Sequence, residues 1–185
     1  MRRVVITFGL LAGFVIACLS WIIGWLCMID KVSLDGTAWI GYASMLIALS
    51  MVFFGIKSYR DNSAGGKITF WKGVQVGLLI SLIAGLMYWA GAQAFSIANP
   101  TFQSKFIQKY TDHTVENMRA QGAPQEEIDK ATANIAQMGK LFENPLLFFL
   151  DCLVEFLPVG FIVTLISAAL LRKKEVLPVT PEFQT

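Results

Sequence analysis

Four long stretches of the chain are almost purely apolar, at residues 4–28, 37–56, 73–98 and 145–171. A helix rises about 1.5 Å per residue, so about 20 apolar residues are enough to cross the ~30 Å hydrocarbon core of a membrane. Each stretch reaches that length. Because backbone groups inside lipid must hydrogen-bond within their own segment, each stretch is expected to be helical. The pattern predicts an all-α membrane protein with four transmembrane helices.

A more polar insert separates the third and fourth apolar stretches. An Asn-Pro pair stands at each of its ends, Asn99-Pro100 and Asn144-Pro145. Asn is a favoured N-cap residue, and Pro is favoured at the first helical position because the backbone N–H that it lacks has no partner there. Both pairs therefore predict the start of a helix.

Two amphipathic helices are expected inside this insert. The first runs from Pro100 to about Arg119 and ends before Gly122, with one aromatic stripe made of Phe102, Phe106 and Tyr110. The second begins at Pro124 and has one apolar face made of Ile128, Ala131, Ile135, Met138 and Phe142. The insert is predicted to be an extracytoplasmic helical hairpin. Its apolar stripes pack on each other, lie on the membrane surface or bind a partner protein.

The positions of Lys and Arg predict how the helices are oriented. Most of the 15 basic residues lie at the N-terminus, in residues 57–72 or after residue 171. Short cytoplasmic loops are rich in Lys and Arg. The short segment 29–36 has a single Lys beside two Asp residues, which suits the opposite side. Both termini are therefore expected in the cytoplasm.

These patterns divide the chain into four parts. Residues 1–98 hold the first three transmembrane helices with a basic cytoplasmic loop at 57–72, and residues 99–144 form the extracytoplasmic helical insert. Residues 145–174 hold the fourth transmembrane helix, and residues 175–185 form a cytoplasmic tail.

The first apolar stretch also resembles a secretory signal, with Ala17-Cys18 similar to a bacterial lipoprotein cleavage site. A processed lipoprotein would continue with polar residues. Here the apolar run continues to Met28, which favours an uncleaved first helix.

Small residues recur every four positions in three of the apolar stretches. The rows are Gly9, Gly13 and Ala17 in the first, Gly73, Gly77, Ser81 and Gly85 in the third, and Gly160, Thr164 and Ala168 in the fourth. Helices in lipid gain little from the hydrophobic effect, so close approach along such rows supports their association. The rows predict helix-packing seams inside the bundle, with a dimer seam as the alternative.

Two carboxylates interrupt the fourth apolar stretch, Asp151 and Glu155. An ionisable residue within a membrane marks a candidate functional site, whereas one at the membrane surface does not. The i, i+4 spacing places both acids on one helix face, and Gln93 and Tyr88 of the third stretch are expected at a similar depth. These four residues form a candidate intramembrane polar site, with an interfacial position of both acids as the alternative.

A basic loop offers a second candidate site. Its Lys57, Arg60, Lys67 and Lys72 are candidate contacts for lipid headgroups or another anion. Each cation near an anionic leaflet contributes ~1 kcal/mol of attraction, so anchoring to the membrane is the first interpretation. A pocket for a phosphorylated ligand is the second. The Gly65-Gly66 pair with its following Lys lacks the spacing and the hydroxyl of a nucleotide-binding loop.

Composition and motifs exclude several classes of function. The chain is 55% hydrophobic and only 15% charged, which is too apolar for an ordinary soluble domain. It contains no zinc-type His motif and no nucleophile elbow, and its single histidine, His113, has no second ligand nearby. We expect no enzyme activity, no cofactor, no metal and no nucleic-acid partner. Cys27 and Cys152 are expected near the outer face, either bridged or as two buried thiols.

Three motifs carry a family resemblance. The first is Gly-Ile-Lys-x-Tyr-Arg-Asp, then Gly-Gly, then Phe-Trp-Lys-Gly, within residues 55–73; the others are the Asn-Pro after the third stretch and MRAQGAPQEEIDKA at 118–131. Together they resemble the bacterial family catalogued as domain of unknown function 4199, over about residues 5–173. The resemblance implies a small integral protein of the bacterial inner membrane with four spans and a charged outer insert. It brings no catalytic residues with it.

Two classes of function remain. The first is a noncatalytic membrane module that acts as a scaffold, a sensor or a partner-binding protein through the outer hairpin. The second is a small ion- or proton-linked transporter or channel component that uses the acids of the fourth helix. The first ranks higher because the other three apolar stretches contain no ionisable residue. The expected partners are the lipid bilayer, a protein at the hairpin, or further copies of the chain.

Overall fold

The computed structural model describes residues 1–29, 31 and 34–172. They form the helices α1 (Arg2–Met28), α2 (Leu34–Ser63), α3 (Phe70–Ala98), α4 (Phe102–Ala120), α5 (Gln125–Glu143) and α6 (Pro145–Leu171). None of the described elements is a strand. By length and composition, four helices can cross a membrane: α1, α3, α6 and the part of α2 from Trp39 to Ser63. The prediction of an all-α chain with four such helices is confirmed.

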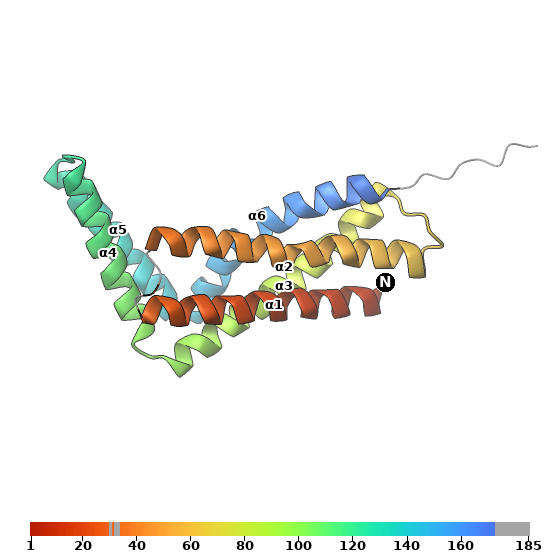
Figure 1. The fold of residues 1–185 in the computed structure, drawn as a ribbon, viewed down its shortest axis with the longest axis horizontal. Coiled ribbons are helices and arrows are strands. Elements are labelled where there is room, and N and C mark those ends of the chain that lie inside the picture. The colour runs from red at the N-terminus through yellow and green to blue at the C-terminus, as the bar shows by residue number, and fades with distance from the viewer. Residues whose placement is uncertain (30, 32–33, 173–185) are drawn as a thin grey trace, which may run out of the picture.

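The four long helices lie side by side as a bundle (Figure 1). α3 packs against α1 and α6, and α2 contacts the other three. α4 and α5 pack on each other beyond one end of the bundle, and we call them the α4–α5 pair. The N-terminus and the end of α6 lie at the opposite end.

The outer surface of the bundle is rich in apolar side chains. Trp39 and Trp71 are 78% and 77% exposed, and Leu170 is 71% exposed. Such exposure would be unfavourable in water, but it suits helices surrounded by lipid chains, with Trp enriched near the two boundaries.

Small residues set the distance between α1 and α3. A Cβ atom on Gly9 would stand 2.7 Å from the Cβ of Ile83, and one on Gly13 would overlap the side chain of Met87. Near the other end of the contact the roles are exchanged, since a Cβ on Gly91 of α3 would lie 2.8 Å from Ala17 Cβ of α1. The two helices can approach this closely only because these positions lack a larger side chain.

A second small-residue contact joins α3 to α6. A Cβ on Gly77 would lie 2.6 Å from Thr164 Cγ2, and one on Gly73 would lie 3.0 Å from Ala168 Cβ. In the same contact, a Cβ on Gly160 of α6 would lie 3.0 Å from Ser81 Oγ of α3. Both small-residue rows of α3 and α6 therefore face each other inside a single chain.

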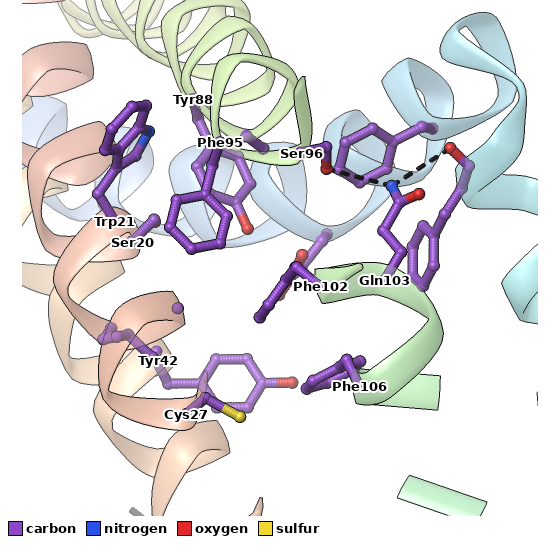
Figure 2. Close-up of a pocket in the computed structure, with 17 residues that line it drawn as sticks. Ser20, Trp21, Cys27, Tyr42, Tyr88, Phe95, Ser96, Phe102, Gln103 and Phe106 are labelled. Carbon is purple, nitrogen blue, oxygen red and sulfur yellow. Dashed lines mark hydrogen bonds between the residues drawn. The ribbon is translucent and has the colours of Figure 1, made fainter. Parts of the chain in front are cut away.

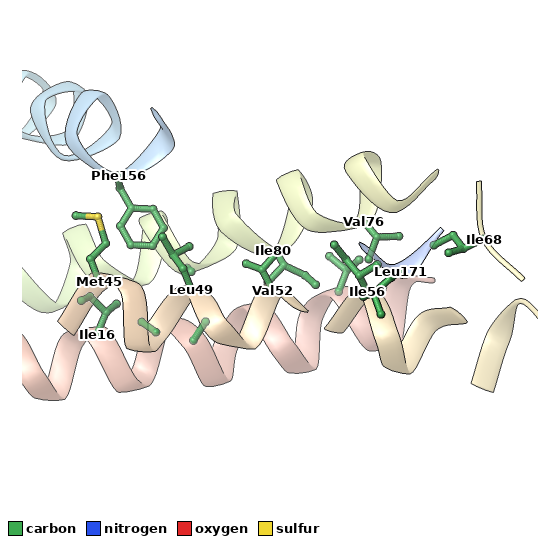
Figure 3. Packing of buried hydrophobic residues seen from close by; sticks show 14 residues of the cluster. Ile16, Met45, Leu49, Val52, Ile56, Ile68, Val76, Ile80, Phe156 and Leu171 are labelled. Carbon is green, nitrogen blue, oxygen red and sulfur yellow. The ribbon is translucent and has the colours of Figure 1, made fainter. Parts of the chain in front are cut away.

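The space between the helices is filled by one apolar cluster (Figure 3). Its largest fully buried side chains come mainly from α2 and α3, with Phe156 from α6: Leu49, Val52, Ile56, Val76, Ile80 and Phe156. Phe156 lies over Met45 and Leu49, so it connects α6 with α2. From there the cluster extends along the bundle to Ile68 and Leu171, away from the α4–α5 pair.

The two helices of the α4–α5 pair pack on each other through the predicted apolar stripe of α5. Ile128 and Ile135 are buried, and a Cβ on Gly139 would be in van der Waals contact with Ile107 of α4, at 3.5 Å. Gly122 in the connecting turn has a φ of +72°, a conformation that residues with a Cβ rarely adopt. The stripe is thus used within the pair, although Met138 is 45% exposed.

The structure confirms one predicted helix boundary and corrects two others. Asn144 caps α6 as predicted, because its side chain accepts hydrogen bonds from Leu146 N and Leu147 N. The predicted N-cap at Asn99 is wrong: its side chain donates to the Phe95 carbonyl and so closes the end of α3, and α4 begins at Phe102. α2 continues past residue 56 to Ser63, so the first part of the predicted basic loop is helical.

Substitution of Gly77 by Leu should weaken the bundle. The larger side chain would collide with Thr164 on α6, and overpacking of this kind costs about 1–3 kcal/mol of unfolding free energy. Thermal unfolding in detergent, followed by circular dichroism, measures the loss. Ala90→Leu is the control, because Ala90 is an exposed residue of the same helix. Equal stability of the two variants would contradict the tight contact between α3 and α6.

Candidate functional site

A cavity of about 360 Å³ lies where the bundle meets the α4–α5 pair, and all six helices contribute to its wall. Eight of its lining residues are aromatic: Trp21, Tyr42, Tyr88, Phe95, Phe102, Phe106, Phe142 and Phe148. Figure 2 shows several of these rings around the space. Among the lining residues that the structure describes, Glu155 is the one with a formal charge. Size, apolar walls and a few polar groups are typical of a small-molecule site.

The aromatic residues form a continuous row from the bundle into α4. The ring of Trp21 meets Phe95 edge-on at 5.5 Å, and Phe95 meets Phe102 edge-on at 4.9 Å. Phe102 then contacts Phe106 at 5.8 Å, and Phe106 stacks on Tyr110 at 6.3 Å. Aromatic pairs at these separations add about 0.5–1.5 kcal/mol each beyond the area they bury. The row therefore fixes α4 against α1 and α3.

Three hydrogen bonds hold the same junction together. Trp21 Nε1 donates to the Gly91 carbonyl at 2.8 Å, which ties α1 to α3. Gln103 Nε2 donates to Ser96 Oγ at 3.2 Å and to the Phe142 carbonyl at 3.5 Å, which ties α4 to α3 and α5 (Figure 2). The base of the α4–α5 pair is thus attached by directional contacts as well as by rings.

A lysine adds a contact between α4 and the end of α1. Lys109 Nζ donates to the Cys27 carbonyl at 3.3 Å, where the negative end of the helix dipole favours a cation. Lys105, Lys109 and Asp112 line a second hollow beside the first, and the two share Phe102 and Phe106 as walls. The lysines therefore border the neighbouring hollow and not the aromatic cavity.

The structure brings together two residues of the candidate intramembrane polar site. Tyr88 and Glu155 both line the aromatic cavity, and the Tyr88 ring stacks on Phe156 at 6.1 Å. Both acids are exposed residues of α6, but Asp151 does not line this cavity. Of the two, Glu155 alone contributes to its wall.

Gln93 does not share the cavity that Tyr88 and Glu155 line. Its Nε2 atom is buried without a hydrogen-bond partner in the described structure, as is Nε1 of Trp89 one turn earlier on α3. Trp89 meets Phe149 of α6 edge-on at 5.4 Å, so this face of α3 looks toward α6. Gln93 is not among the residues that line the aromatic cavity.

The four basic candidate residues gather at the opposite end of the bundle. Lys57 and Arg60 lie on the last turns of α2, Lys67 in the following loop and Lys72 on the first turn of α3. Arg60 Nε donates to Asp61 at 2.7 Å, and Lys72 Nζ donates to Gln75 at 3.0 Å. Their position at one end of the bundle agrees with contacts to lipid headgroups.

The cysteines do not form the disulfide that was one of two interpretations of the sequence. None of Cys18, Cys27 and Cys152 is part of a disulfide, and the last two are buried. Within residues 1–29, 31 and 34–172, His, Cys, Asp and Glu form no group that could hold a metal ion.

Sequence reasoning found the aromatic stripe of α4 but not the cavity. Trp21, Tyr42 and Phe95 come from three different helices, and no spacing in the sequence connects them. The i, i+4 spacing of Phe102 and Phe106 indicated an aromatic stripe on this helix, but packing of that stripe on α5 explained the spacing equally well.

Comparison with known proteins adds a family. A family model described as a protein of unknown function, DUF4199, matches residues 7–173. The chain belongs to this family. The match covers all four membrane-type helices and the α4–α5 pair, so the cavity lies wholly within the family region. No curated protein and no solved structure matches the chain.

Replacement of Phe102 by Ala should loosen the base of the α4–α5 pair. Phe102 is half-buried, and the substitution removes two ring contacts and one wall of the cavity. The lost ring contacts and the lost apolar area together cost about 3 kcal/mol locally. We expect amide hydrogen exchange in α4 to become about 100-fold faster, as measured by mass spectrometry in detergent. Tyr110→Ala is the control, because Tyr110 has one such contact at the end of the row. Similar acceleration in both variants would show that the row does not anchor α4.

Proposed function

We propose that this protein is a noncatalytic sensor of the bacterial inner membrane that binds an apolar ligand beneath an extracytoplasmic helical hairpin. The observation that carries this proposal is the wall of the aromatic cavity, which is shared by all four bundle helices and by the α4–α5 pair. A ligand in the cavity would contact both parts at once. Its binding would therefore favour the arrangement of the pair that makes these contacts.

The α4–α5 pair is well suited to transmit such a change. It projects beyond the bundle and contacts it mainly at its base (Figure 1). Its exposed residues are mostly polar, and apart from the turn at Gly122 it consists of two helices that pack on each other. A second protein or another copy of the chain could recognise this unit, so the sensor also serves as a partner-binding module.

The orientation of the sensor rests on charge. Arg2, Arg3, Arg172 and the four basic candidate residues belong to the end of the bundle opposite the α4–α5 pair. Because Lys and Arg near membrane helices favour the cytoplasmic side, both termini are cytoplasmic and the hairpin is outside.

A transporter built around the acids of α6 is less well supported. On the side of the cavity that faces away from the α4–α5 pair, the apolar cluster contains the fully buried residues Phe156, Leu49 and Ile80. They form a layer with no described ionisable side chain across the middle of the bundle. Such a layer favours binding at one side over passage through the protein.

Reporter fusions test the orientation. A reporter inserted after Ala64, in the loop between α2 and α3, should be active only as a cytoplasmic reporter. One inserted after Gln121, at the turn of the α4–α5 pair, should be active only as an external reporter. The reverse pattern would place the cavity on the cytoplasmic side and overturn the proposed topology.

Partial filling of the cavity tests its coupling to the hairpin. Gly41 lines the cavity, and a Cβ added there meets no atom within 4 Å, so Gly41→Leu should place its side chain in the space without a clash. New apolar contacts worth about 1 kcal/mol should slow hydrogen exchange in α4 about five-fold in lipid nanodiscs. Ala43→Leu is the control, because Ala43 is exposed and does not line the cavity. Equal exchange in both variants would separate cavity and hairpin and contradict the sensor.

A further inference from the structure

We propose that the aromatic cavity binds a lipophilic organic cation, a ligand with an apolar body and one positive charge, with Glu155 as its counter-ion. This inference rests on the proposed ligand-sensing function and names the class of ligand. It follows from two features of the cavity that are independent of each other: the aromatic rings of its wall and its single carboxylate.

The aromatic lining favours a cation as well as an apolar body. A positive charge over the face of Trp, Tyr or Phe is attracted by the ring electrons, with about 0.5–2 kcal/mol per contact, most when water is excluded. Trp21, Tyr42 and Tyr88 are contributed by three helices on different sides of the space. A ligand of modest size can therefore contact several rings, which together with the apolar wall residues would bind its hydrocarbon part.

The carboxylate supplies the charge complementarity. Glu155 lines the cavity, and no described residue forms an ion pair with it. A carboxylate beside apolar surfaces is costly unless an opposite charge or hydrogen-bond donors compensate it. A bound cation would compensate Glu155, whereas an anion would be repelled by it. A neutral ligand would gain only the apolar contacts.

The nearby lysines do not reverse this preference. Lys105 and Lys109 line the adjoining hollow, beyond Phe102 and Phe106, and Lys109 is engaged by the carbonyl at the end of α1. Asp151 is on the same helix as Glu155 but outside the cavity. The site therefore depends on one acid, and its neighbour provides a matched control.

Equilibrium dialysis tests the inference directly. The full chain is reconstituted in phosphatidylcholine nanodiscs, and binding of radiolabelled tetraphenylphosphonium is measured against that of tetraphenylborate, an anion of the same shape. We expect saturable binding of the cation and none of the anion. Glu155→Gln should weaken cation binding at least about ten-fold, equivalent to about 1.4 kcal/mol. Glu155→Asp should retain part of the affinity, and Asp151→Asn should change it less than about two-fold.

The possible results distinguish failure of the cation inference from failure of the proposed sensor. Equal cation binding to the wild type and Glu155→Gln, or saturable binding of the anion, would overturn the inference. Thermal unfolding of every variant checks that lost binding is not lost folding. A neutral fluorescent probe, N-phenyl-1-naphthylamine, tests the cavity separately. If it binds the wild type but not Gly41→Leu while the cation does not bind, the cation inference fails and the sensor stands. If neither probe binds, both fail.

Discussion

The close approach of α3 to both α1 and α6 is the contact on which the rest of the structure depends. In lipid, helices are held together largely by van der Waals contact, which requires small residues where backbones meet. Gly9 and Gly13 admit side chains of α3 on one side, and Gly73 and Gly77 admit Ala168 and Thr164 of α6 on the other. Since α1 and α6 are both positioned by α3, this helix determines the arrangement of the bundle, and α2 fills the side that remains.

The cavity forms where the small-residue contact between α3 and α6 ends. A Cβ added to Gly77 of α3 would lie 2.6 Å from the Thr164 side chain of α6. A Cβ added to Gly85, two turns further along α3, would lie 3.5 Å from the Phe156 side chain. Beyond Gly85 the contacts between α3 and α6 are made by rings, Tyr88 with Phe156 and Trp89 with Phe149. Large side chains hold two helices further apart than glycines do. α3 and α6 therefore stand further apart toward the α4–α5 pair, while α1 and α3 stay close at Gly91. The aromatic residues at the base of the pair line the resulting space without filling it.

The sequence was informative where one segment carries the whole signal and uninformative where several segments meet. Apolar stretches of sufficient length predicted the four membrane-type helices, and Asn144-Pro145 predicted the start of α6, because lipid and helix capping act on consecutive residues. The similar pair Asn99-Pro100 misled: Asn99 instead bonds back to Phe95 and closes α3, since its side chain can serve either helix. The cavity could not be predicted, because its walls come from six helices. Depth along the helices was enough to predict that Tyr88 lies near Glu155. Nothing in the sequence indicated that Trp21 and Phe95 line the same cavity.

Two acids one turn apart on the same helix acquire different roles through their position relative to this widening. Glu155 is 16 residues before Leu171, which places it ~24 Å from the basic end of the bundle if α6 is straight, within a hydrocarbon core of ~30 Å. Asp151 lies one turn closer to the α4–α5 pair, near the boundary where water can solvate it. Pro158, less than a turn after Glu155, has no N–H to donate to the Val154 carbonyl. The wide end of the bundle thus combines the carboxylate of Glu155 with aromatic rings in the wall of one cavity. Both favour a positively charged guest, and the fully buried Phe156, on which Tyr88 stacks, belongs to the apolar cluster of the bundle.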